Sequence, residues 1–114
     1  VTLPKTVEKI GDYAFEGCTS LTAVTAEGGI TSLPARAFSG CTALTDVSLP
    51  QSIKKIGEYA FAYCTSLTEI HVGSSAVLAE GALYACSAEL TIYAPSGSGG
   101  EKYATRYGIK FSEE

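Results

Sequence analysis

The sequence contains no asparagine, no tryptophan and no methionine. The lack of asparagine excludes every N-glycosylation sequon, and the lack of tryptophan removes the usual aromatic platform for sugars. Methionine is missing even from position 1, so we expect the chain to be a processed product or a piece of a longer protein. A targeting signal would in that case lie outside these residues.

Charged residues and long hydrophobic runs are also scarce. Only 18% of the residues are charged, and 8 basic against 12 acidic side chains give a formal net charge of −4. The longest basic cluster is the pair Lys54-Lys55, which is too short to neutralise a run of phosphates. No apolar stretch approaches the roughly 20 residues that cross a bilayer. We therefore expect neither a nucleic-acid partner nor a membrane span in this chain.

What the sequence does contain is an internal repeat. Four segments share the pattern Ala-Phe/Leu-x-x-Cys, at residues 14–18, 37–41, 60–64 and 82–86. The cysteines at positions 18, 41, 64 and 86 are therefore 23, 23 and 22 residues apart. Other apolar residues recur with the same period. A repeat of this length is typical of solenoid proteins, in which each unit buries its apolar face against its neighbours.

The recurring apolar positions define the expected core. One phase holds three phenylalanines and a leucine, a second holds the four cysteines, and a third holds leucines three residues after the first three cysteines. Stacked repeats would place like side chains on one another in a continuous core. The predicted core residues are Phe15, Phe38, Phe61, Leu83, Cys18, Cys41, Cys64, Cys86, Leu21, Leu44 and Leu67.

Each repeat also contains an alternating stretch. In the stretch that ends at Pro50, Val47 and Leu49 point to one side of the chain. Asp46 and Ser48 point to the other side, which is the period of a half-buried strand. The Tyr-Ala-Phe-x-x-Cys segment is too short for an independent helix, so we expect a single turn of α or 3₁₀ helix there. Together these elements predict an α/β repeat solenoid with short parallel strands and about 23 residues per repeat.

The motif Leu-x-x-Val/Ile-x-Leu followed by Pro, and then Ile-Gly-x-x-Ala-Phe-x-x-Cys, covers Val1 to about Pro95. It resembles the BspA-type leucine-rich repeat of bacterial surface proteins. The resemblance implies a right-handed superhelix of about four repeats plus a last strand over residues 1–95. The fourth repeat departs from the motif, because Leu83 replaces the phenylalanine and one residue is missing upstream.

The end of the chain is similar to the terminal unit of such arrays. The stretch 91–95 is followed by Glu-Lys-Tyr-Ala at 101–104 and by Tyr-Gly-Ile-Lys-Phe at 107–111. In such units the chain leaves the solenoid through a short helix and a final strand. Residues 96–114 are therefore expected to be a linker and a C-terminal cap within one structural domain. The glycine-rich stretch 96–100 lacks a nucleotide-binding register and is expected to be a flexible connection.

The resemblance also implies a function. Such repeats belong to cell-surface or secreted proteins associated with adhesion, so the expected role is non-enzymatic protein–protein interaction. The candidate partners are host extracellular matrix proteins or other cell-surface proteins. A structural spacer with no partner of its own is the first alternative, and carbohydrate binding is the second. The fragment itself is expected to be a monomer or a weak edge-to-edge dimer.

Two sets of residues could in principle bind a metal ion or act in catalysis: the four cysteines and the surroundings of His71. No two cysteines lie within the short spacing of a metal site, and stacked cysteines would point in parallel, so free buried thiols without metal or cofactor are expected. His71 has Glu69 and Asp46 near it in the repeat frame, but an acid–base pair needs a pocket. An open strand face provides none, so no catalytic residue is expected.

In the broader leucine-rich repeats a hydrogen-bond ladder follows the strand. The corresponding hydroxyl column here is Thr6, Gly29, Ser52 and Ser75, interrupted at the glycine.

The remaining candidate is the outward row of the strand face. Its N-terminal part carries small and hydroxyl side chains, whereas its C-terminal part gathers two acids, a histidine and a tyrosine. Solenoids commonly bind partners on such a surface, although a solvated sheet face would also be polar without binding anything. The predicted patch consists of Asp46, Ser48, Glu69, His71 and Tyr93.

Overall fold

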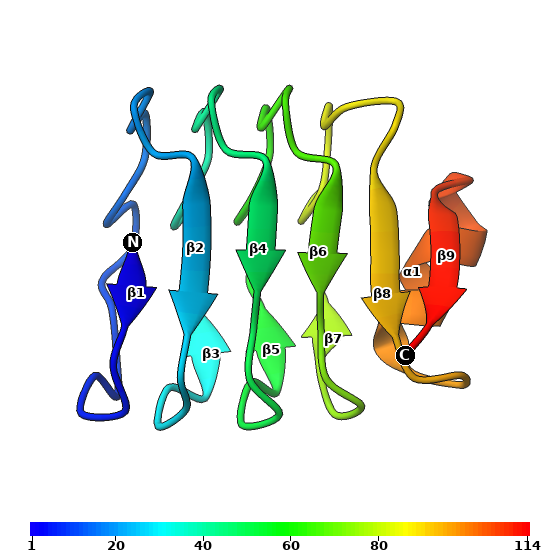
Figure 1. The fold of residues 1–114 in the computed structure, drawn as a ribbon, viewed down its shortest axis with the longest axis horizontal. Helices are drawn as coiled ribbons and strands as arrows, with labels where there is room; N and C mark the ends of the chain where they lie inside the picture. The colour runs from blue at the N-terminus through cyan, green and yellow to red at the C-terminus, as the bar shows by residue number, and fades with distance from the viewer.

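The computed structural model describes residues 1–114 as a solenoid with strands stacked side by side (Figure 1). One sheet has six parallel strands in the order β1-β2-β4-β6-β8-β9, and a second has three in the order β3-β5-β7. The strands of the first sheet are β1 (Thr2–Leu3), β2 (Ala23–Ala26), β4 (Asp46–Ser48), β6 (Glu69–His71), β8 (Thr91–Ala94) and β9 (Lys110–Glu113). Those of the second are β3 (Ser32–Leu33), β5 (Lys55–Ile56) and β7 (Val77–Leu78). The one helix is α1 (Gly99–Tyr107). The predicted parallel-stranded solenoid is confirmed.

The repeat period sets the strand register. Val24 lies beside Val47, Val47 beside Ile70, and Ile70 beside Ile92. All four side chains are at most 1% exposed, so each coil covers the apolar residue of the next. The intervening residues point outward, which gives β2 and β8 their alternating burial. Burial of this apolar column holds the sheet in register, because a slip of one residue would turn every buried side chain to solvent.

The second sheet was not predicted. Its strands are two residues long, and the repeat pattern predicts no strand at these positions. Leu33 pairs with Ile56, and Ile56 with Leu78, at the same repeat phase. Two residues are too few to show an alternating pattern, so these strands follow from the stacking of the coils and not from a local signal.

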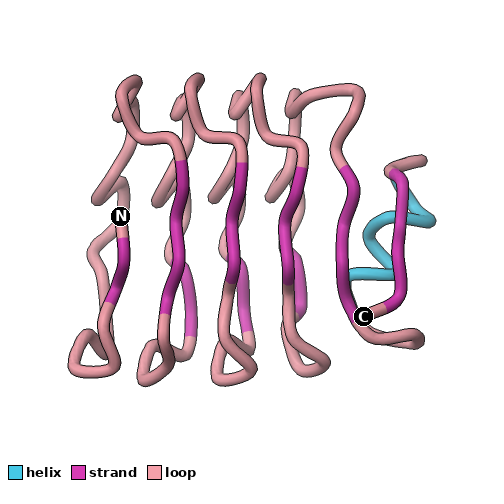
Figure 2. Tube along the Cα trace, in the orientation of Figure 1, coloured by secondary structure: helices cyan, strands magenta, loops and turns pink.

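The Ala-Phe segments form hydrogen-bonded turns, not the helical turns that were expected (Figure 2). Two residues of each segment have positive φ. The first position has φ 62° at Tyr13, 56° at Arg36, 56° at Tyr59 and 69° at Gly81; the second has 72° at Gly17, 77° at Gly40, 61° at Tyr63 and 58° at Ala85. Left-handed residues interrupt a right-handed helix. They turn the N–H of Phe38 toward Ala60 O of the next coil, at 2.7 Å. Bonding between coils therefore replaces bonding within a helix.

The second left-handed position allows a matched pair of substitutions. Ala85 is exposed to solvent and has φ 58°. The substitution Ala85→Gly therefore removes backbone strain and takes away only one methyl group that was in contact with water. We expect the free energy of unfolding to rise by about 0.5–1 kcal/mol in a urea titration. Gly40→Ala at the same phase should lower it by about 1 kcal/mol, since the new Cβ meets nothing closer than 3.7 Å and the effect is strain alone. If both substitutions change the free energy of unfolding in the same direction and by the same amount, backbone strain does not explain their effects.

The core is a stack of like side chains. The rings of Phe15 and Phe38 are parallel with centroids 5.0 Å apart, and those of Phe38 and Phe61 follow at 5.1 Å. Of the residues proposed for the core, those fully shielded from solvent are Phe38, Phe61, Cys41, Cys64, Leu44 and Leu67, with Leu83 at 4% exposure. The partly buried ones are Phe15, Cys18, Leu21 and Cys86, which pack against the core. The first three belong to the first coil, which has a neighbour on one side only.

The cysteines form a hydrogen-bonded column. All four are free thiols, as expected. Cys41 Sγ donates to Phe15 O, Cys64 Sγ to Phe38 O and Cys86 Sγ to Phe61 O, each at 3.2 Å. Each thiol thus satisfies a carbonyl of the preceding coil. Burial raises the pKa of Cys64 to about 12, because the thiolate would lose its hydration.

This column predicts how stability depends on alkaline pH. Below about pH 9 the Cys64 thiol keeps its proton in both the folded and the unfolded chain. Between about pH 9 and 12 the unfolded chain releases the proton while the folded chain retains it, so the free energy of unfolding falls as pH rises. Urea titrations across this range should show a shallower fall for Cys64→Ala than for the wild type. Identical slopes would mean that Cys64 ionises freely in the folded protein.

A helix and a strand follow the last coil, as the terminal-unit resemblance implied. The glycine-rich stretch is not wholly a flexible connection, because Gly99 and Gly100 lie in the first turn of α1. Ser98 caps the helix by accepting a hydrogen bond from the N–H of Glu101, and Gly108 ends it at φ 68°. Glycine is required at position 99, since a Cβ there would collide with Ala76 O. The helix can therefore lie directly against the last coil.

The expected hydroxyl ladder is found in only one place. Ser52 Oγ donates to Ile30 O at 2.7 Å, but Thr6 and Ser75 make no side-chain hydrogen bond. A ladder occurs instead at the start of the strands, where Thr45 donates to Thr22 O and Thr68 donates to Thr45 O, at 3.2 and 3.4 Å. The reason is position: the backbone N–H of each of these threonines already donates to the same carbonyl of the preceding coil, so the hydroxyl lies close to it.

Candidate functional site

The register of the six-stranded sheet places the outward side chains in two rows. One row reads Thr2, Thr25, Ser48, His71, Tyr93 and Ser112, and the other reads Ala23, Asp46, Glu69, Thr91 and Lys110. Each residue lies directly beside its neighbour on the next strand. The five residues of the predicted patch therefore lie on β4, β6 and β8, which are three neighbouring strands of this sheet (Figure 1). We call Asp46, Ser48, Glu69, His71 and Tyr93 the strand-face patch.

His71 is the centre of this patch. Its ring stacks on the ring of Tyr93, with centroids 4.6 Å apart and an angle of 11° between the planes. Its Nδ1 lies 2.7 Å from Glu114 Oε2, and its Nε2 lies 3.8 Å from Glu69 Oε1. The imidazole is thus fixed by one stacking contact and one short hydrogen bond, while about a third of its side chain remains exposed. A side chain held in this way loses little further freedom on binding a partner.

The other two predicted residues extend the patch toward the N-terminal coils. Ser48 lies beside His71, and its hydroxyl makes no hydrogen bond within the protein. Asp46 lies beside Glu69, and its Oδ2 accepts a hydrogen bond from Thr45 Oγ1 at 3.2 Å. Two neighbouring carboxylates face solvent here without a cation between them. The structure places His71 between Glu69 and Tyr93, with Asp46 beside Glu69 and Ser48 beside His71.

Residues of β9 and the adjoining Glu114 complete the surface, and none of them belongs to the predicted patch. β9 pairs with β8 so that Lys110 lies beside Thr91 and Ser112 beside Tyr93. The backbone N–H of Glu114 then donates to Ala94 O at 3.0 Å, which holds its side chain near His71. A final strand was expected, but its register is not set by the 23-residue period. The alternation of Lys-Phe-Ser-Glu is the one local signal that points to these residues.

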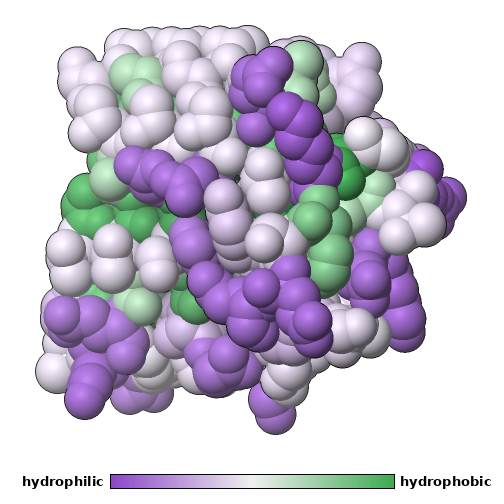
Figure 3. All heavy atoms as spheres, turned by 45° about the vertical axis from the view of Figure 1, so that its right-hand side comes forward, coloured by the Kyte–Doolittle hydropathy of each residue, from purple (hydrophilic) through white to green (hydrophobic).

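The patch is acidic. Glu69 and Glu114 flank the single histidine, and Asp46 lies beside Glu69. The one lysine or arginine in the two outward rows, Lys110, is paired with Glu89 at 2.9 Å. Lys110 lowers the pKa of Glu89 by its hydrogen bond and its charge. Hydrophilic side chains gather across the middle of this face in the surface view (Figure 3). The surface therefore favours a partner that offers positive charge or hydrogen-bond donors.

The strand-face patch lies outside the cavities of the molecule. The two cavities of the molecule contain no residue of the patch. No group of three or more histidine, cysteine, aspartate or glutamate side chains has an arrangement that could hold a metal ion. No helix is both long enough and apolar enough to cross a membrane. What the patch offers is a flat, polar, partly aromatic surface.

Comparison with known proteins identifies the repeats. A family model described as "BspA type Leucine rich repeat region" matches residues 1–99 in 6 copies. The chain belongs to this family. The resemblance stated from the motif is confirmed, and the BspA-type repeats account for every strand from β1 to β8. No curated protein matches the chain.

Two solved structures resemble this BspA-type repeat chain. One is a leucine rich cell surface protein from Faecalibacterium prausnitzii, with 21% identity and a TM-score of 0.53, over 99% of this chain and 38% of that one. The other is a leucine-rich repeat protein from Bacteroides ovatus, with 25% identity and a TM-score of 0.45, over 100% of this chain and 42% of that one. The first supports the leucine-rich repeat fold. This chain spans less than half the length of either protein.

Proposed function

We propose that this chain is a non-enzymatic protein-binding module of a bacterial cell-surface or secreted protein, and that it binds its partner through the strand-face patch. The BspA-type family and the resemblance to a leucine rich cell surface protein support the location. The observation that carries the binding role is the fixed His71 imidazole, which is stacked on Tyr93 and bonded to Glu114. A surface ordered before binding loses less conformational entropy when the complex forms.

The chemistry of the patch defines the kind of partner. Two carboxylates and a tyrosine ring lie around one imidazole, with the Asp46 carboxylate beside Glu69, and this set matches a protein surface rich in lysine or arginine. Host extracellular matrix proteins and other cell-surface proteins are the candidates. The affinity of such an interface should rise as the salt concentration falls, because fewer ions then screen the solvent-exposed charges of the patch.

The test is a binding titration of the isolated chain against a panel of extracellular matrix proteins. The variant Asp46→Ala/Glu69→Ala/His71→Ala removes the centre of the patch, and we expect it to lose saturable binding. Glu8→Ala/Asp12→Ala removes two exposed acids from the first coil and is expected to bind normally. Circular dichroism confirms that each variant is folded. Equal loss in both variants would point to non-specific charge attraction instead of the patch.

If the folded wild type binds no member of the panel, the spacer role becomes the better account of this chain. Carbohydrate binding has less support. The guanidinium of Arg36 covers the ring of Tyr59 at 5.0 Å, and the Tyr63 and Tyr84 rings meet edge to face. None of these rings forms a flat aromatic platform of the kind that sugars stack on.

A further inference from the structure

A row of backbone hydrogen bonds joins the Ala-Phe turn of each coil to the turn of the next coil. In each row, N–H groups of three alternate residues donate to three alternate carbonyls. The bonds of the third coil run from Tyr59 to Glu80 O, from Phe61 to Ala82 O and from Tyr63 to Tyr84 O, at 3.3, 2.8 and 2.8 Å. The last coil has the same three donor positions at Gly81, Leu83 and Ala85, but no further turn of this kind follows it.

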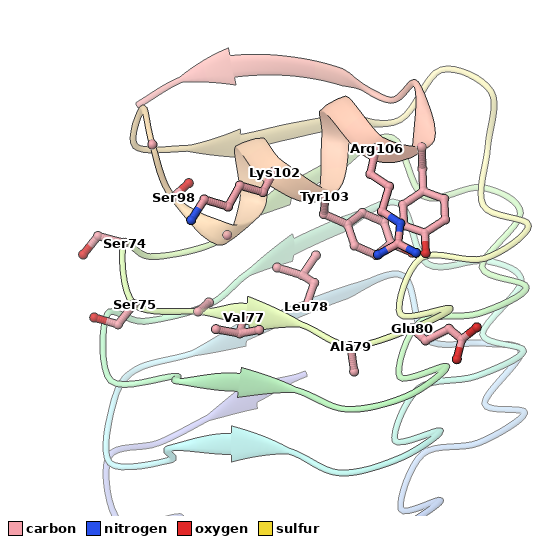
Figure 4. A pocket seen from close by; sticks show the side chains of 14 residues that line it. Ser74, Ser75, Val77, Leu78, Ala79, Glu80, Ser98, Lys102, Tyr103 and Arg106 are labelled. Atoms are coloured by element: carbon pink, nitrogen blue, oxygen red, sulfur yellow. The ribbon is translucent and has the colours of Figure 1, made fainter.

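The C-terminal cap replaces only the middle bond of the row. Leu83 N–H donates to Tyr103 Oη at 3.1 Å. Figure 4 shows the Tyr103 side chain extending from the helix toward the last coil. The N–H groups of Gly81 and Ala85 have no acceptor within the chain. An unpaired backbone donor at a buried residue such as Gly81 is rare in native proteins, so this N–H is available to an acceptor from outside the chain.

Both unpaired donors line a cavity between this turn and the cap, which we call the turn–cap cavity. It has a volume of about 230 Å³. Its lining consists of Gly81, residues 83–87 and Leu90 from the last coil, with Tyr103, Tyr107 and Ile109 from the cap. No charged side chain is among them. The volume lies below the roughly 300–1,000 Å³ of small-molecule pockets, so the cavity suits one or two residues of a larger partner.

Two exposed tyrosine rings form walls of the turn–cap cavity. Tyr84 is 55% exposed and Tyr107 is 45% exposed. The Tyr84 ring meets the rings of Tyr59 and Tyr63 edge to face, with centroids 6.3 and 5.6 Å apart. The Tyr107 ring lies against the Tyr103 ring, with centroids 4.5 Å apart. Each wall is therefore open to a partner but already positioned by its neighbours, so it loses little freedom on binding.

We propose that the turn–cap cavity binds a proline-rich peptide segment in the polyproline II conformation. Proline rings would pack against Tyr84 and Tyr107, as such segments do in aromatic-lined grooves. Carbonyl oxygens of the segment would accept hydrogen bonds from the N–H groups of Gly81 and Ala85. A polyproline II helix has no internal hydrogen bonds, so its carbonyls are available. Proline also has no N–H of its own that an apolar cavity would leave unpaired.

This binding site is separate from the strand-face patch. The patch lies on β4, β6 and β8 and shares no residue with the turn–cap cavity. The patch selects a partner by charge, whereas the uncharged cavity selects one by aromatic contacts and backbone donors. Each proposal can therefore fail without affecting the other.

The first test uses the whole chain and a fluorescein-labelled, end-capped peptide of about eight prolines, which is roughly 25 Å long. Fluorescence anisotropy should show saturable binding to the wild type. Tyr84→Ala should weaken it at least about tenfold, a change of roughly 1.4 kcal/mol. Tyr13→Ala removes a tyrosine that is 53% exposed from the first coil and should leave the affinity unchanged. Absence of saturable binding, or equal loss in the two variants, would overturn the proposal.

A control peptide tests the preference for proline. A glycine–serine peptide of the same length offers the same backbone carbonyls, but it has no rings and is a flexible coil. We expect it to bind at least about tenfold more weakly than the proline peptide. If the two peptides bind equally well, the assignment of a proline-rich partner is wrong.

Backbone hydrogen exchange, followed by NMR, tests the two donors without altering the protein. Saturation with the proline peptide should protect the amides of Gly81 and Ala85 relative to those of Tyr59 and Tyr63. The latter pair occupies the same positions in the coil before and is already bonded to the last coil, so it provides the internal control. If the peptide binds without this relative protection, the N–H groups of Gly81 and Ala85 do not hold it and the proposed mode is wrong.

Discussion

Replacing Phe38 with alanine is expected to lower the free energy of unfolding by about 3–5 kcal/mol. The Phe38 side chain is completely buried and lies between two parallel rings, at 5.0 Å from Phe15 and 5.1 Å from Phe61. Truncation removes both stacking contacts and leaves a cavity that the neighbouring coils cannot fill, because their spacing is fixed by backbone hydrogen bonds. Since domains of this size are stable by only about 5–15 kcal/mol, the loss is a large part of the total.

Urea titration followed by circular dichroism measures this loss, and Phe15→Ala provides the comparison. Phe15 stacks on one ring only and is partly exposed in the first coil, so its truncation should cost distinctly less. A stack whose stability spreads over nearest-neighbour contacts predicts this order of effects. If the two variants are equally destabilised, the rings do not act as a continuous column and the cost comes from each coil alone.

The sequence predicts the fold well wherever the repeat period itself determines the structure. The alternation around Val47 and Leu49 predicts the main strands, and the 23-residue spacing predicts which residues stack, because each coil must bury the same face. The Ala-Phe segment was misjudged for a physical reason. Propensity favours a helical turn there, but left-handed residues such as Arg36 and Tyr59 turn the backbone N–H groups toward the next coil. That choice follows from stacking and is invisible in a single repeat.

The candidate site shows the same division. The repeat frame places Glu69 and His71 on one face, and the structure shows His71 beside Glu69 and stacked on Tyr93. Glu114 lies outside the periodic region, so no spacing rule could predict its 2.7 Å contact with His71. The cavity between β7 and α1 has no counterpart in the repeat pattern, because it lies between a two-residue strand and a helix that comes after the repeats.

Replacing Gly57 with alanine is the second substitution for which a large loss of stability is expected, about 1–3 kcal/mol. Gly57 is buried beside the backbone of the preceding coil, and its N–H donates to Leu33 O at 2.8 Å. A Cβ at this position would lie 2.7 Å from Pro34 C and 2.8 Å from Ala35 N. Both atoms belong to the backbone, which cannot move aside as a flexible side chain would. The two coils must separate, and the hydrogen bond between them must lengthen or break.

Gly11→Ala is the matched control, because Gly11 lies at the same repeat phase and a Cβ there would have no neighbour within 4 Å. That variant should be neutral or slightly more stable, since alanine restricts the unfolded chain more than glycine does. Urea titration measures the free energy of unfolding of both variants. The comparison distinguishes a steric clash between coils from a preference for glycine in the backbone conformation of this position. Equal loss in the two variants would show that the position needs glycine for its backbone conformation. A loss confined to Gly57→Ala would show that stacking, which one coil alone does not provide, selects glycine here.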